Sequence, residues 1–228
     1  MPESLTDIIH QADALYGARA LMENVRASIP LLNEAATDIY EAAWRLGRAH
    51  FFLGQEALDE KHARESYKRG IEASEHAVQL AAARVEGHFW LGVNLALLAQ
   101  KENILSALIH ALRAKKALER AVEIDRTYHA AGPLRVLARL QHKLPRPLGG
   151  GHARARINFE QAVKLAPANT VTRIYFAELL TDIGDETAAR AQLEAVLHAP
   201  IDSAWEFEAI RDRSLAQEKL TVMERIRD

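Results

Sequence analysis

The stretch Ala155-Arg-Ile-Asn-Phe159-Glu-Gln-Ala162-Val-Lys-Leu-Ala-Pro167 decides the fold of this chain of 228 residues. It places a small residue, an aromatic residue four positions later, a second small residue after three more, and a proline after five more. Residues three and four apart share one face of an α-helix, and proline ends or kinks a helix. The stretch therefore predicts a helix that ends near Pro167 and packs closely against a neighbouring helix.

The same pattern recurs along the chain. A unit of about 34 residues that ends at Pro167 predicts a large–small pair at Phe176-Ala177 and a turn glycine at Gly184, and both are present. Earlier large–small pairs lie at Leu46-Gly47, Leu91-Gly92 and Leu137-Ala138. These offsets are typical of tetratricopeptide repeats. The sequence thus predicts an all-α fold, a tetratricopeptide-like α-solenoid of about four helix pairs with a capping helix at each end.

The predicted organisation is a single helical-repeat domain over residues 1–228. The four repeat units are expected at 37–82, 85–124, 130–165 and 171–197. Helices over 1–30 and 203–226 are expected to cap the array, because a terminal unit would otherwise expose its stacking face. Residues 142–151 contain two prolines and three glycines, so a loop is expected in this segment of the third unit.

The composition disfavours most kinds of chemistry. Without cysteine, the chain forms no disulfide or thiolate site, and its ten histidines show neither a His-Glu-x-x-His motif nor an i, i+4 pair that would suggest zinc. No Ser/His/Asp constellation stands out, and no glycine motif has the strand-then-helix context of a nucleotide site. We therefore expect a protein that is not an enzyme and has neither metal nor cofactor.

Short segments of the sequence bear on localisation, on membrane insertion and on nucleic-acid binding. Residues 1–7 lack the basic start and apolar run of a signal peptide, and there is no lipobox cysteine. The chain as written is therefore expected in the cytoplasm, whereas removal of a leader would place it in the periplasm. The longest apolar run, 89–99, is about half a membrane span, so no integral membrane segment is expected. The basic run 113–120 has acidic neighbours and no aromatic residues, which disfavours nucleic acid.

The first helix of each repeat is expected to line a concave groove. The candidate binding residues are Trp44, Arg48, Phe51, Phe89, Val93, Leu97, Arg135, Arg139, His142, Lys143, Ile174 and Glu178. The first half of this set is apolar and aromatic, and the third unit is basic. Arg135 and Arg139 are spaced i, i+4, so their guanidinium groups could hold a carboxylate or phosphate together. The alternative is that the aromatic residues are core and the arginines pair with acidic neighbours.

Several segments, in this order, resemble the T-component family of tripartite (TRAP-type) transporters. They are Ala12-Asp-Ala-Leu-Tyr16, Tyr40-Glu-Ala-Ala-Trp-Arg-Leu-Gly47, Glu86-Gly-His-Phe-Trp-Leu-Gly-Val93, Ala131-Gly-Pro-Leu-Arg-Val-Leu-Ala138, Lys143-Leu-Pro145 and Gly149-Gly-Gly151. The chain is also similar, more distantly, to the helical-repeat domain of regulator-of-microtubule-dynamics proteins. The resemblance to the T-components implies a non-catalytic helical-repeat protein, often a periplasmic lipoprotein. It also implies association with itself and with the transporter's substrate-binding subunit, and apolar cavities for a small or lipid-like ligand.

Two functions follow as expectations. The first is a protein–protein interaction scaffold, acting as a transporter accessory component, whose partner is another protein or a second copy of the chain. The alternative is a carrier or sensor of a small amphiphilic anion, such as a lipid or organic acid, held in the concave groove. Because a fold alone does not fix a function, the two stay open at this point.

Overall fold

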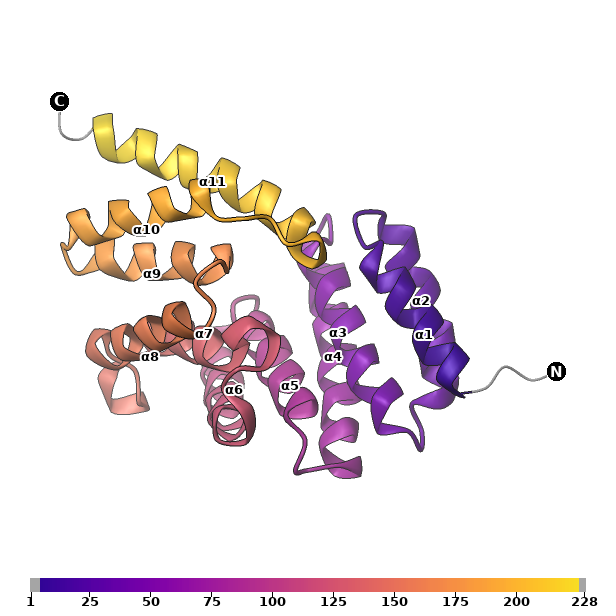
Figure 1. The fold of residues 1–228 in the computed structure, drawn as a ribbon. Coiled ribbons are helices and arrows are strands. Elements are labelled where there is room, and N and C mark those ends of the chain that lie inside the picture. Colours follow the sequence, from indigo (N-terminus) through magenta and orange to yellow (C-terminus); the bar gives the residue numbers. More distant parts are fainter. Residues whose placement is uncertain (1–4, 226–228) are drawn as a thin grey trace. The chain divides into compact units, whose positions relative to one another are not determined.

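The computed structural model describes residues 5–225, and every regular element in this range is helical. The helices are α1 (Leu5–Gly17), α2 (Met22–Ala35), α3 (Tyr40–Gln55), α4 (Glu60–Leu80), α5 (Val85–Ala99), α6 (Ile104–Asp125), α7 (Tyr128–Lys143), α8 (His152–Leu165), α9 (Thr170–Asp182), α10 (Glu186–His198) and α11 (Glu206–Arg225). Short 3-10 turns lie at Arg146–Leu148 and Ser203–Trp205. The predicted all-α class is confirmed (Figure 1).

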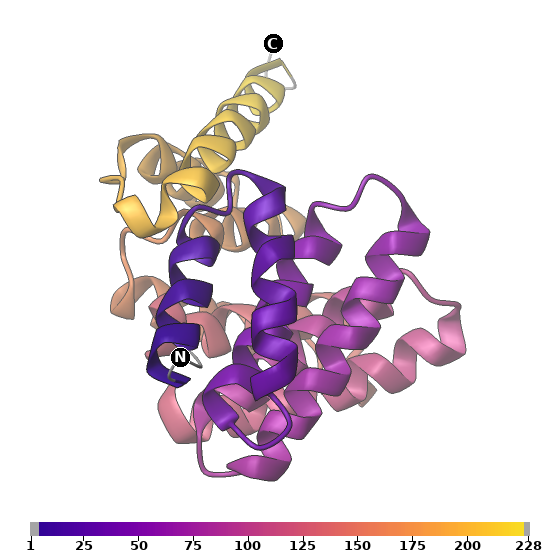
Figure 2. The same cartoon turned by 90° about the vertical axis from the view of Figure 1, so that its right-hand side faces the viewer.

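The chain divides into two compact units, Met1–Asp125 and Arg126–Asp228. In the first unit, helices adjacent in the sequence pack against one another from α1 to α6. Figure 1 shows α6 and α5 next to the overlapping α3 and α4, and Figure 2 shows this unit from the side of α1 and α2. In the second unit, α7 packs on α8, α9 packs on α10, and α11 covers α9 and α10. The expectation of one domain over the whole chain stays a prediction.

The prediction of a single helix over 1–30 is wrong. Residues 1–4 lie outside the described part, α1 ends at Gly17, and α2 begins at Met22 and continues through Pro30 to Ala35. The turn between them is closed by hydrogen bonds, since the side-chain amide of Asn24 donates to Ala18 O at 2.9 Å. At the other end, α11 begins at Glu206 after a 3-10 turn, three residues later than expected, and residue 226 lies outside the described part.

Two irregular segments frame α7. The predicted loop is confirmed from Leu144 onward, where Gly149 and Gly151 have φ values of 83° and 128°, a region that favours glycine. At the start of α7, residues His129, Ala130 and Ala131 have φ values of 53–57°. A left-handed turn of L-residues costs roughly 1–2 kcal/mol per residue, so contacts in the second unit must compensate for it. One such contact joins the rings of His129 and Trp205, whose centroids lie 4.7 Å apart.

Small residues lie where the helices of the first unit cross, as the large–small pairs predict. A Cβ added to Gly47 on α3 would collide with Ser74 of α4, and one added to Gly70 on α4 would collide with Asn94 of α5. A Cβ on Gly92 of α5 would lie 2.6 Å from Cγ of Leu118 on α6. Each helix of this series therefore approaches the next at a point where no larger residue fits.

The stretch 155–167, from which the repeat was predicted, contributes to the core of the second unit. Ala155, Phe159 and Ala162 are fully buried, together with Ala189 and Val196 of α10. The rings of Phe159 and Phe176 stack with centroids 5.6 Å apart. The helix ends at Leu165, two residues before Pro167, as the proline predicts.

The buried side chain of His50 makes the folding stability depend on pH. Burial, together with the nearby Arg69, lowers the pKa of His50 to about 4 from an ordinary value of 6.5. Below pH 6.5 the unfolded chain therefore binds the proton before the folded one, so folding stability falls as the pH falls. Between pH 7 and pH 5 we expect His50 to remove up to about 2 kcal/mol from the free energy of unfolding.

Urea denaturation at both pH values, for the wild type and for His50→Leu, measures this contribution. The variant lacks the titrating group and should lose less stability than the wild type over the same interval. Equal losses in the two proteins would contradict the assignment.

Candidate functional site

In the first unit, the candidate groove residues lie on α3 and α5 and are mostly buried. Phe89, Val93 and Trp44 are 1%, 6% and 8% exposed, while Phe51 and Leu97 are half-buried. The ring of Phe51 lies against that of Trp90, with centroids 5.2 Å apart. The aromatic residues thus have the burial expected of core positions.

The charged member of this group, Arg48, is already bound by residues of α1. Its guanidinium donates to Asp13 Oδ1 at 2.7 Å and lies 3.9 Å from the ring centroid of Tyr16. Asp13 also accepts from Arg45 at 2.8 Å. Although burial acts in the opposite direction, hydrogen bonds from both arginines hold the pKa of Asp13 below its ordinary value. A guest that bound Arg48 would therefore have to displace an ionised carboxylate of α1.

The aromatic ring beside Arg48 is also anchored. Trp44 Nε1 donates to Glu41 Oε2 at 2.9 Å, and the Arg45 guanidinium lies 4.2 Å from the Trp44 ring centroid. Glu41 in turn forms ion pairs with Arg45 and Arg84 at 2.6 and 3.0 Å. This network fixes the orientation of Trp44 before any ligand arrives.

In the second unit, α7 and α9 bring two of the predicted residues into direct contact. Arg139 forms an ion pair with Glu178, and Lys219 of α11 lies 3.2 Å from the same carboxylate. The Arg139 guanidinium also lies 4.6 Å from the ring centroid of Tyr175. Burial favours a higher pKa for Glu178, but the two cations prevail and lower it. Ile174, on the same helix, is 2% exposed and belongs to the core.

One helical turn further along α7, His142 and Lys143 share a second carboxylate. His142 Nε2 lies 2.8 Å from Asp182 Oδ2, and Lys143 Nζ lies 3.5 Å from the same oxygen. Burial lowers the pKa of His142, against the opposite influence of its hydrogen bond with Asp182. The Lys143 side chain is 54% exposed, so it is the most accessible cation of the predicted set in this unit.

Arg135 lies in a different environment from Arg139. It is 5% exposed, and within the described residues its two hydrogen-bond acceptors are uncharged, Ala130 O at 3.1 Å and Asn169 Oδ1 at 3.3 Å. Burial lowers its pKa to about 10. Asn169 also caps α9 by accepting from Thr172 N at 3.0 Å. The two guanidinium groups thus have separate partners here, and joint binding of an anion stays a prediction.

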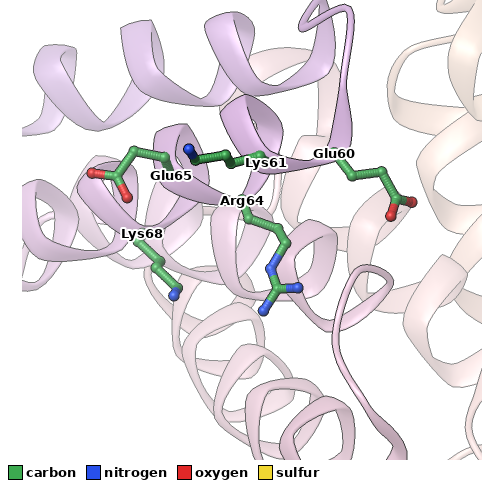
Figure 3. A pocket seen from close by; sticks show the side chains of 5 residues that line it. All are labelled: Glu60, Lys61, Arg64, Glu65 and Lys68. Atoms are coloured by element: carbon green, nitrogen blue, oxygen red, sulfur yellow. The ribbon is translucent and has the colours of Figure 1, made fainter.

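A surface depression on α4 was not anticipated from the sequence. Figure 3 shows its lining residues, and its volume is about 300 Å³. The lining residues are Glu60, Lys61, Arg64, Glu65 and Lys68. Two of these side chains are acidic and three are basic, and Arg64 forms an ion pair with Glu102 at 3.1 Å. Charges of both signs are thus present in the depression and partly paired.

Within 5–225, no cluster of three or more histidine or acidic side chains has the geometry to hold a metal ion. None of the helices in this range combines the length and apolarity needed to cross a bilayer.

Comparison with known proteins identifies relatives of the sequence and of the fold. The family model described as TRAP transporter T-component matches residues 44–220. No curated protein matches the chain. The crystal structure of TTC0263, a thermophilic TPR protein in Thermus thermophilus, is 17% identical, covers 94% of this chain and 99% of that one, and gives a TM-score of 0.70. Yeast Tom70 is 15% identical, covers 90% and 60%, and gives a TM-score of 0.36, which is too low to support an inference.

The likeness to TTC0263 extends over nearly the whole of both chains. It shows that the described helices have the tetratricopeptide-like arrangement predicted from Phe159 and its neighbours, and so confirms the predicted fold class. At this identity it is informative about the fold alone.

Proposed function

The chain belongs to the TRAP transporter T-component family, and on this premise we propose that it is a non-catalytic scaffold that binds a protein component of such a transporter. The match of the family model to residues 44–220, which reaches into both units, carries the proposal. The helical-repeat fold supports it, because such repeats present side chains on rigid, regularly spaced elements.

The distribution of perturbed groups also favours binding over catalysis. Catalytic sites gather acids and bases with shifted pKa values around a cleft. Here the buried His50 lies on α3, Arg135 lies on α7 in the other unit, and neither faces the depression on α4. Burial within its own unit accounts for the lowered pKa of each of these two groups.

The direct test mixes the purified chain with the substrate-binding subunit of a TRAP transporter from the same organism. Size-exclusion chromatography with light scattering should show a complex whose mass gives the stoichiometry, and also whether the chain associates with itself. An unrelated ligand-binding protein of similar size is the control. Absence of a complex at concentrations far above a micromolar Kd would overturn the transporter scaffold.

A second candidate, a carrier or sensor of an amphiphilic anion, is favoured by the cations around α7. Among the described residues, Arg139, Lys143 and Lys219 form ion pairs with two carboxylates, those of Glu178 and Asp182. The excess of positive charge would attract a carboxylate or phosphate head group. Such a head group would compete with Glu178 for Arg139. Arg139 would therefore favour binding of the head group, and Glu178 would oppose it.

Oleate retention distinguishes this function. The protein is incubated with oleate, passed through a desalting column and examined by native mass spectrometry. Arg139→Ala should lose most of the bound oleate, whereas Glu178→Gln should keep or gain it, because the competing carboxylate is removed. The same retention in the wild type and in both variants would exclude a head-group site at Arg139.

A further inference from the structure

Helix α6 has one side committed to the fold. Ala114, Leu118 and Ala121 are fully buried, and Leu118 lies where a Cβ on Gly92 of α5 would collide. Within the first unit α6 packs on α5. These residues are three or four apart, so together they define the inward side of the helix.

The opposite side of α6 begins with a contiguous apolar surface. Leu105, Ile109 and Leu112 follow one another at i, i+4 and i+7, and are 75%, 59% and 40% exposed. Ile104, beside Leu105, is 87% exposed. Single exposed aliphatic residues are ordinary, but several that adjoin on one helix face mark an interaction surface. Covering these side chains would be favourable in proportion to the apolar area removed from water.

The same side of the helix continues as a basic surface. Lys116 and Arg120 follow Leu112 on the outward face and are both exposed. Arg120 forms an ion pair with Glu123 at 3.0 Å, while among the described residues no carboxylate pairs with Lys116. The outward stripe of α6, defined as Leu105, Ile109, Leu112, Lys116 and Arg120, is thus apolar toward its N-terminal end and carries two cations toward its C-terminal end. Of these, Arg120 is paired with the exposed Glu123, and Lys116 has no such pair among the described residues.

We propose that this outward stripe is the docking surface for an amphipathic α-helix of a partner protein, with acidic residues at the N-terminal end of that helix and apolar residues at its C-terminal end. An antiparallel orientation brings its carboxylates to Lys116 and Arg120 and its apolar residues to Leu105 and Ile109. It also aligns the two helix dipoles favourably. The stripe spans about 22 Å at 1.5 Å per residue, so the partner helix needs about four turns.

This inference rests on the proposed scaffold function and adds the surface and the kind of partner. Charge complementarity indicates the kind of partner, because a helix with acidic and apolar residues complements a surface that is basic at one end and apolar at the other. A membrane surface fits less well. Helices that lie on membranes carry cations along the whole polar face and often aromatic residues on the other, whereas the stripe has no aromatic residue and confines its cations to one end.

Peptide binding tests the proposal. The probe is a fluorescein-labelled helical peptide of about 18 residues on an Ala/Gln background. It has two Glu four residues apart near its N terminus and then three Leu in the mirror-image spacing of the stripe. A peptide of identical composition with the two blocks exchanged is the control for orientation. Fluorescence anisotropy of the full chain should show binding of the first peptide at least about tenfold tighter than of the second, and weakening by added salt.

Matched variants locate the binding surface. Leu105→Gln with Ile109→Gln removes the apolar part of the stripe, and should weaken binding at least about tenfold because two aliphatic contacts are lost. Ile157→Gln with Ile210→Gln is the control, since these residues on α8 and α11 are similarly exposed, at 55% and 57%. Unchanged thermal unfolding of both double variants verifies that they are folded.

Each other result overturns the proposal in a distinct way. Equal binding by the two double variants, or no binding by the wild type, refutes the surface. Binding to vesicles of anionic phospholipid that is lost only in the α6 variant assigns the stripe to a membrane. Dimers in sedimentation that are lost in the same variant assign it to self-association. A chain that binds the transporter subunit but not the peptide refutes this inference while leaving the proposed function intact.

Discussion

The close approach of neighbouring helices at glycine is the constraint on which the first unit depends. Gly47, Gly70 and Gly92 each lie where a methyl group would overlap the next helix. Asn94 strengthens the same region, since its side-chain amide donates to Gly47 O at 3.1 Å and to Trp90 O at 2.9 Å and so ties α5 to α3. Because a single methyl group is felt in a close-packed interior, these positions fix the distance between helices, and thereby the spacing of every side chain that the helices present.

In both units, residues of the protein itself hold the charged groups expected to bind a ligand. The charged residues of the expected groove are engaged by the protein itself, Arg48 by Asp13 and Arg139 by Glu178. Such partners fix the side chains in position, and they also mean that a guest must replace a carboxylate that is already bound. The outward stripe of α6 differs in its apolar part, where Leu105, Ile109 and Leu112 are exposed, whereas Arg120 at its other end is paired with Glu123. A partner helix could therefore cover the apolar part and approach Lys116 without replacing a bound carboxylate, and would meet an existing ion pair only at Arg120.

The sequence was informative where a pattern reflects local packing. The offsets around Phe159 predicted the helix, its end and its burial, and the large–small pairs located Gly92 at a helix contact. It could not show that Pro30 lies within a helix, or that residues 129–131 form a left-handed turn without glycine. Nor could it show which carboxylate pairs with Arg139, because Glu178 is 39 residues away and the pairing depends on how two helices are rotated about their axes. For the basic run 113–120 of α6 the sequence indicated only that nucleic acid is disfavoured, because the exposure of Leu105 and Ile109 near it is seen only in the structure.

A double-mutant cycle on Gly92 and Leu118 tests the packing constraint most directly. Gly92→Ala places a Cβ 2.6 Å from Cγ of Leu118 and should destabilise the protein by about 1–3 kcal/mol. Leu118→Ala should cost about 2–5 kcal/mol. In the double variant the truncated residue leaves room for the new methyl group, so the combined loss should be smaller than the sum by about 1 kcal/mol or more. Losses that add to within about 0.5 kcal/mol would contradict close packing at this position as the basis of the fold.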